Sequence, residues 1–143
     1  MACPLCEQAA RAGRGKHPWL IAELAESFAL LGDNQGPRGW CVLVLKEHAE
    51  HVADLTADRQ ARLWDDVRHT AAAQRAVFGP VRINYECLGN LVPHVHWHLI
   101  PRHADDPQPR DPVWLWPRER QAGSMKDEDR RALVSSLRGA LGR

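Results

Sequence analysis

The alternation of apolar and polar positions begins with a region that predicts a pair of short strands. Apolar stretches at residues 19–23 and 27–31 flank three mixed positions and predict a β-hairpin. The spacing of Ile21, Leu24 and Phe28 fits one face of a helix almost as well, so the pattern leaves a helix open as the alternative.

A loop, a buried strand and a long helix are predicted next. Residues 32–39 are polar and contain glycine and proline, which is typical of a loop, whereas the apolar run 40–45 is typical of a buried strand. Thr56 is a good N-cap for a helix whose apolar positions recur every three or four residues until Gly79 and Pro80 end it. The helix is therefore predicted over residues 57–78.

The rest of the chain predicts two more strands and a closing helix. Residues 81–88 and 95–100 have strand character, and residues 127–141 carry apolar positions at helical spacing. The proline-rich segment 102–120 cannot be regular throughout. This order predicts an α+β fold over residues 1–143 as one domain, with an antiparallel sheet of about five strands, one long helix and a C-terminal helix.

Composition limits the classes of partner. The chain is 44% hydrophobic and 26% charged, and its 19 basic and 18 acidic residues give a net charge of +1. The basic residues are dispersed among acids, so no nucleic-acid partner is expected. No apolar run approaches the roughly 20 residues of a membrane span, and the first residues lack the pattern of a signal peptide. We therefore expect a cytoplasmic protein without a membrane partner.

Three of the eight histidines lie within five residues. In a strand, alternate side chains share a face, so His94, His96 and His98 would form a row while the residues between them pack into the core. Each imidazole can act as a nucleophile, proton carrier or metal ligand near neutral pH. The alternatives are chance histidines on a solvent-facing strand, or a metal site that uses all three.

The four cysteines fall into two kinds. Cys3 and Cys6 have C-x-x-C spacing, which lets two thiolates bind adjacent corners of a tetrahedral metal site. A redox dithiol and an unligated tail are the alternatives for this pair. Cys41 and Cys87 lie in apolar, strand-like runs, so we expect both to be small buried apolar side chains.

The segment His94–Ile100 has the pattern His-φ-His-φ-His-φ-φ, where φ is apolar, and it resembles the signature of the histidine triad (HIT) hydrolases and transferases. The resemblance extends over most of residues 3–102. It includes Leu45–His48, Gly89-Asn90 and Pro101-Arg102. The segment Leu88–His98 resembles the bacterial diadenosine-polyphosphate-hydrolase-like subgroup in particular.

The resemblance implies a HIT-like fold and a nucleotide hydrolase that acts on dinucleoside polyphosphates or nucleoside phosphoramidates. His96 would attack the α-phosphate and form a nucleotidyl-histidine intermediate, with no magnesium requirement. A neutral imidazole suits this role because it carries no charge that repels the phosphate. His98 would hold a phosphate oxygen, and Asn90 would donate to the phosphate or to the leaving-group oxygen. A nucleotidyltransferase and a non-catalytic nucleotide-binding protein remain alternatives.

The same resemblance suggests how the substrate is held. Asp33 and Asn34 would contact the ribose hydroxyls, although both are also common turn residues. Asn84 and the backbone at Gly89 would lie near the phosphate. Trp40 stands where many relatives have histidine, and it could stack on a purine or pack in the core.

A structural zinc site and a homodimer are also implied by the resemblance. The zinc ligands would be Cys3, Cys6, His48 and His94, with His51 as an alternative to His48. The related proteins are commonly homodimers.

The remaining histidines and tryptophans have less specific expectations. His17, His69 and His103 are expected to face solvent. The segment Trp114–Trp116 is expected to make packing or dimer contacts.

Overall fold

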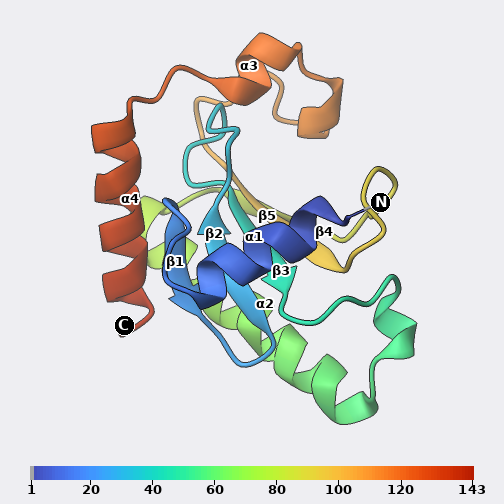
Figure 1. Ribbon diagram of the computed structural model, residues 1–143. Helices are drawn as coiled ribbons and strands as arrows, with labels where there is room; N and C mark the ends of the chain where they lie inside the picture. The colour runs from blue at the N-terminus through green and yellow to red at the C-terminus, as the bar shows by residue number, and fades with distance from the viewer. Residues whose placement is uncertain (1) are drawn as a thin grey trace.

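The computed structural model describes residues 2–143 and contains a five-stranded antiparallel sheet with helices on both faces (Figure 1). The strands lie in the order β1-β2-β3-β5-β4, and every neighbouring pair is antiparallel. The predicted α+β class, with five strands, one long helix and a C-terminal helix, is confirmed. The elements are α1 (Pro4–Gly13), β1 (Leu20–Glu23), β2 (Ser27–Leu31), β3 (Cys41–Leu45), η1 (Val52–Asp54), α2 (Ala57–Phe78), β4 (Arg82–Glu86), β5 (His96–Arg102), η2 (Val113–Leu115), α3 (Arg118–Ala122) and α4 (Asp127–Ala140).

The hairpin of β1 and β2 is confirmed, and the helical alternative is wrong. A buried carboxylate explains why the chain turns here. Asp66 on α2 accepts hydrogen bonds from the backbone N–H groups of Ala25 and Glu26 and from the hydroxyl of Ser27. Because these donors are satisfied within the turn, the two strands can bury their apolar side chains in the core.

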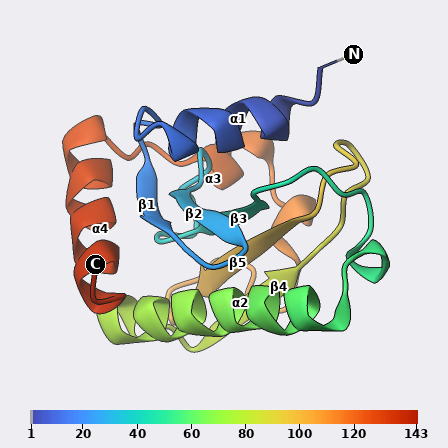
Figure 2. The ribbon, with the colours of Figure 1, turned by 60° about the horizontal axis from the view of Figure 1, so that its bottom comes forward.

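Helix α2 covers one face of the sheet (Figure 2). It begins and ends as the sequence predicts: the Thr56 hydroxyl accepts the N–H of Arg59 at 3.3 Å, and Gly79 ends the helix in the left-handed conformation at φ 56°. Helix α4 packs against α2 and β1. The main core lies between these helices and the sheet and is centred on the fully buried Val67, Leu43 and Leu99.

Helix α1 covers the opposite face, and the sequence analysis did not predict it (Figure 2). Its signals are modest: Pro4 stands at the start of the helix, and Leu5, Ala9 and Ala12 recur at helical spacing on its buried side. These side chains pack against residues of β2 and β3, chiefly Phe28, Leu30 and Val44.

The histidine strand is shifted relative to the prediction of residues 95–100. β5 begins at His96, and His94 lies before it and is fully buried, so the three histidines do not form one row on one strand. β5 also continues through Pro101 to Arg102. The backbone C=O of Arg102 accepts the N–H of Val81 next to β4, and neighbouring residues of a strand point their backbone groups to opposite sides. The nitrogen of Pro101 therefore faces the β3 side, where the pairing of β3 with β5 has already ended at Leu99.

The two remaining cysteines differ. Cys41 is fully buried in β3, as expected. The expectation for Cys87 is wrong: β4 ends at Glu86, and Cys87 is exposed at the start of the following loop.

Within residues 2–143, none of the helices combines the length and apolarity that crossing a membrane requires.

Candidate active site and metal cluster

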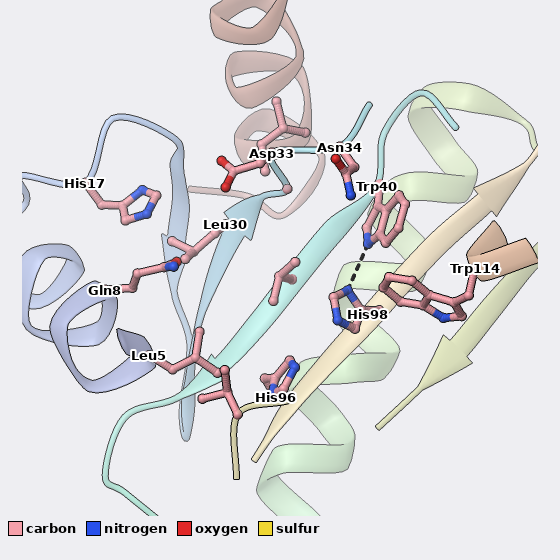
Figure 3. A pocket seen from close by; sticks show the side chains of 14 residues that line it. Leu5, Gln8, His17, Leu30, Asp33, Asn34, Trp40, His96, His98 and Trp114 are labelled. Carbon is pink, nitrogen blue, oxygen red and sulfur yellow. Dashed lines mark hydrogen bonds between the residues drawn. The ribbon is translucent and has the colours of Figure 1, made fainter. Parts of the chain in front are cut away.

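An open cleft of about 210 Å³ lies on the α1 face of the sheet and contains two of the three triad histidines (Figure 3). Its lining comes from α1, from β2 and β3, from β5, and from the connecting segments. Those residues are Leu5, Gln8, His17, Leu30, Leu31, Gly32, Asp33, Asn34, Trp40, Val42, Val92, His96, His98 and Trp114. The cleft is therefore apolar where α1 faces β2 and β3, and polar near the end of β2 and along β5.

The protonation of His96 is set by a backbone contact. Its Nδ1 lies 2.6 Å from the carbonyl oxygen of His94, and a carbonyl can only accept, so Nδ1 carries the proton. In the neutral form of the ring, the other nitrogen, Nε2, then keeps its lone pair. Because His96 lines the cleft, this lone pair can act there as a nucleophile.

His98 has the opposite tautomer. The indole N–H of Trp40 donates to Nδ1 of His98 at 3.0 Å, so the proton of the neutral ring is on Nε2 (Figure 3). Burial, together with the nearby His96, lowers the pKa of His98 to about 4. At neutral pH, His98 is thus an uncharged N–H donor. The centroid of its ring lies 5.2 Å from that of His96.

The lowered pKa of His98 predicts a loss of stability in acid. In the unfolded chain, His98 binds a proton as the pH falls below its ordinary pKa of 6.5, whereas in the folded chain it binds this proton only near pH 4. The free energy of unfolding therefore decreases as the pH drops from about 6.5 to about 4. The contribution of His98 is expected to reach about 3 kcal/mol. Urea unfolding of the wild type and of His98→Asn between pH 7 and pH 4 measures it, because Asn retains an acceptor for Trp40 but cannot titrate.

The difference between the two proteins isolates His98, since both share every other titrating group. The variant is expected to have the shallower dependence on pH. Parallel curves would contradict the assignment.

Trp40 and Trp114 form the wall next to His98. Trp40 is 2% exposed, so it packs in the core, and it also meets Trp114 edge to face, with ring centroids 5.3 Å apart. Trp114 also makes an edge contact with His98 and donates its indole N–H to the carboxylate of Glu86 on β4. The expectation of packing contacts for 114–116 is correct for Trp116, which is buried, but Trp114 belongs to the cleft.

Some of the predicted substrate contacts lie at the cleft and others do not. Asp33 and Asn34 line it, at the end of β2. Asn84 instead accepts a hydrogen bond at 2.8 Å from the guanidinium of Arg102. Gly89 and Asn90 lie in the loop after β4, where Gly89 has φ 75° and Asn90 is exposed, and neither is part of the lining.

The sequence analysis missed the contribution of the N-terminal segment. Leu5 and Gln8 of α1 face the cleft, and so does His17, which is half-buried rather than solvent-facing as expected (Figure 3). His103 is likewise half-buried and donates to the backbone carbonyl of Arg38, whereas His69 is exposed as expected. The available signals were Pro4 at the start of α1 and the apolar spacing along this helix.

Next to the cleft, Cys3, Cys6, His48 and His94 bring their donor atoms within 4.8 Å of one another. This is the predicted ligand set, and His51 is not part of it. The measured distances are 3.4 Å for Cys3 Sγ to His94 Nδ1, 3.4 Å for Cys6 Sγ to His48 Nδ1, 3.5 Å for Cys6 Sγ to His94 Nδ1, and 3.2 Å between the two Nδ1 atoms.

These four residues fit a tetrahedral metal ion. With ordinary zinc bond lengths, the nitrogen–nitrogen edge of such a site is about 3.3 Å and a sulfur–nitrogen edge about 3.5 Å. The His94 ring is also oriented correctly, because its Nε2 donates to the carbonyl of Leu45 at 2.9 Å and leaves the Nδ1 lone pair free for a metal. Burial lowers the pKa of His94, which favours the neutral form that a ligand needs.

Comparison with known proteins agrees with this geometry. The family model described as HIT domain matches residues 18–105, more than half of the chain. The chain belongs to the HIT domain family. The protein Hit of Bacillus subtilis (strain 168) is 31% identical over an alignment of 102 residues that covers 59% of this chain and 70% of that protein.

Solved structures extend the similarity to the whole fold. A histidine triad protein from Bradyrhizobium japonicum is 27% identical, with a TM-score of 0.78 over 90% of this chain and 94% of the other. A histidine triad protein from Sinorhizobium meliloti is 28% identical, with a TM-score of 0.75 over 83% and 86%. A HIT protein from Mycobacterium smegmatis, described as zinc-bound, is 21% identical, with a TM-score of 0.70 over 99% and 94%, and therefore shares the fold.

Proposed function

We propose that this HIT protein hydrolyses nucleotides at the α-phosphate, with His96 as the nucleophile. The observation that carries the proposal is the bond from Nδ1 of His96 to the carbonyl of His94, which leaves Nε2 unprotonated in the cleft. Attack forms a bond from Nε2 to phosphorus and breaks the bond from phosphorus to the leaving group. Water then hydrolyses the nucleotidyl-histidine, releasing a nucleoside monophosphate and restoring His96.

The other residues of the cleft bind the substrate. The Nε2–H of His98 donates to a non-bridging phosphate oxygen, where negative charge increases in the transition state. Asp33 and Asn34 bind the ribose hydroxyls, and the apolar lining from α1 and β2 accommodates the base. Asn90 and the backbone of Gly89 reach the phosphate only if the loop after β4 closes over it, whereas Asn84 bonds to Arg102 and lies outside the cleft lining.

The substrates that test this function are diadenosine polyphosphates and adenosine phosphoramidate, as suggested by the similarity of Leu88–His98 to the diadenosine-polyphosphate-hydrolase-like subgroup. Release of AMP from either supports the hydrolase. Transfer of the nucleotidyl group to inorganic phosphate would favour the transferase, because both reactions share the intermediate. Tight binding without turnover would favour a nucleotide-binding protein.

We also propose that Cys3, Cys6, His48 and His94 hold a structural zinc ion. Two observations support this zinc site. The four donor atoms have nearly the spacing of a tetrahedral site, and the protein supplies all four ligands. Zinc would supply folding free energy here, by tying α1 to the sheet, and no chemistry. None of the four cysteines is in a disulfide bond in the part of the chain that the structure describes, which suits the reducing cytoplasm that we propose as the location.

A homodimer through the β4 edge is the assembly we propose. In the sheet of residues 2–143, β4 is an edge strand, and beside it Tyr85 and Trp64 are 46% and 53% exposed, with ring centroids 6.5 Å apart. An exposed edge bordered by aromatic side chains is suited to pairing with a second copy.

Sedimentation is expected to give twice the chain mass, and Tyr85→Lys is expected to give the monomer, because it places like charges across the two-fold axis. Ala10→Lys, on the exposed side of α1, is the control that leaves the dimer intact. A monomeric wild type would rule out the dimer.

A further inference from the structure

We infer that Glu86 and Trp114 make the cleft select a neutral or cationic leaving group, such as an amine, over a polyphosphate chain. The inference rests on the proposed function and names the class of substrate that the cleft accepts. It follows from where these two residues lie relative to His98 and from the charges of the cleft.

Trp114 is held in place by its neighbours and by Glu86. Val113 and Trp116, on either side of the 3-10 turn η2, are 0% and 6% exposed and pack with Trp40. The indole N–H of Trp114 donates to Glu86. The Trp114 ring lies beside that of His98 (Figure 3), with the two centroids 5.2 Å apart. This indole therefore forms the boundary of the cleft next to the His98 imidazole.

Glu86 lies on the side where the leaving group is expected. The proposed ribose contacts are at the end of β2, and the sheet order places β5, then β4, progressively farther from β2. Glu86 is the register partner of His98, so the two side chains share a face of the sheet, with Cβ atoms about 5 Å apart. Glu86 is not itself one of the residues that line the cleft, so its carboxylate acts on a phosphate at His98 through its charge, from the side opposite the proposed ribose contacts.

The cleft offers no cation to offset that carboxylate. Of the described residues that line it, one is a carboxylate, Asp33, and none is lysine or arginine. Arg102, on the same strand as His98, is buried in an ion pair of 2.6 Å with Asp106 and bonds to Asn84. The pKa values of His98 and His17 are both lowered by burial, which keeps these rings neutral.

These charges discriminate between leaving groups. A polyphosphate chain brings several further negative charges toward Glu86 and finds no permanent cation among the lining residues. An amine brings none. As Nε2 of His96 bonds to phosphorus, the phosphorus–nitrogen bond breaks and its electron pair stays on nitrogen. The nitrogen takes one proton from the solvent to leave as the neutral amine, and a second solvent proton converts this amine to the alkylammonium ion. The ammonium is attracted by the Glu86 carboxylate and by the face of Trp114.

The test measures kcat/KM for an adenosine phosphoramidate of an alkylamine and for diadenosine tetraphosphate, in the wild type, Glu86→Gln and Glu86→Lys. We expect the wild type to prefer the phosphoramidate. The ratio of kcat/KM for the phosphoramidate to kcat/KM for diadenosine tetraphosphate should fall about tenfold in the Gln variant and further in the Lys variant. Added salt should reduce the preference in the wild type more than in the Gln variant, because salt screens the repulsion. Glu23→Gln, at the opposite edge of the sheet, is the control that leaves the ratio unchanged.

The ratio is a readout that a purely structural role of Glu86 would not move, because partial unfolding lowers both rates together. Turnover of both substrates at an unchanged ratio in the Gln variant would overturn the inference and leave the proposed function intact. A wild-type preference for the polyphosphate would do the same. No turnover of either substrate would overturn the proposed function, and the inference with it.

Discussion

Replacing His96 by Asn is expected to lower kcat for nucleotide hydrolysis by about 10⁴-fold or more, because Asn has no lone pair that can attack phosphorus. Asn is similar in size to this part of the histidine side chain, and its amide N–H can also donate to the carbonyl of His94, so the cleft should keep its shape. Substrate binding is expected to persist while turnover is lost. Steady-state kinetics together with calorimetric titration of a nucleoside monophosphate separate these two effects.

A covalent intermediate gives a second readout of the same substitution. Rapid quenching of the wild type during turnover should yield protein that is heavier by one nucleoside monophosphoryl group, attached at His96. The Asn variant should yield none. His69→Asn, an exposed position on α2, is the matched control and should behave as the wild type. Equal rates in wild type and His96→Asn would refute the mechanism outright.

Loss of the metal is expected to have the largest effect on stability. Purified protein should contain one zinc per chain, and Cys6→Ser should contain much less, because a neutral hydroxyl is a poor ligand compared with a thiolate. The free energy of unfolding is expected to fall by about 4 kcal/mol, which is the contribution of a ligand present at roughly a thousand times its dissociation constant. This loss corresponds to a decrease of about 10 °C in melting temperature. Elemental analysis and thermal unfolding with and without a chelator measure the two quantities.

His51→Asn is the control for this site, because His51 is near His48 in sequence but lies outside the four-residue cluster. It should keep both zinc and stability. A wild type that is purified without metal, and whose melting temperature does not respond to added zinc, would exclude the structural zinc ion.

Local patterns were enough to predict most of the fold. The helix from Ala57 to Phe78 has a cap, an apolar face and a glycine stop, and all three signals agree. The strands were predictable because short apolar runs lie between clear loops. The helix α1 was not predicted because its buried face consists mostly of alanines, whose apolar signal is weak, and because its position depends on contacts with β2 and β3.

The candidate site was predictable where it follows from one strand and less so where it depends on distant segments. His96 and His98 flank a single residue, and strand geometry alone puts them on one face. No local pattern could place Trp114 beside His98, because that contact depends on how a proline-rich segment crosses the sheet. The burial of His94 similarly depends on Leu45 and on the N-terminal thiols.

His94 takes part in both centres through different atoms. Its Nδ1 lies among the four clustered donors, while its backbone oxygen holds the proton of His96. A substitution of the His94 side chain therefore removes a donor from the cluster but leaves the carbonyl that orients the nucleophile. The side chain at position 94 is therefore constrained by the metal cluster, by its full burial and by its bond to the carbonyl of Leu45, and not by the tautomer of His96. A descendant that lost the metal could replace His94 with another buried side chain and still present His96 with the proton on Nδ1.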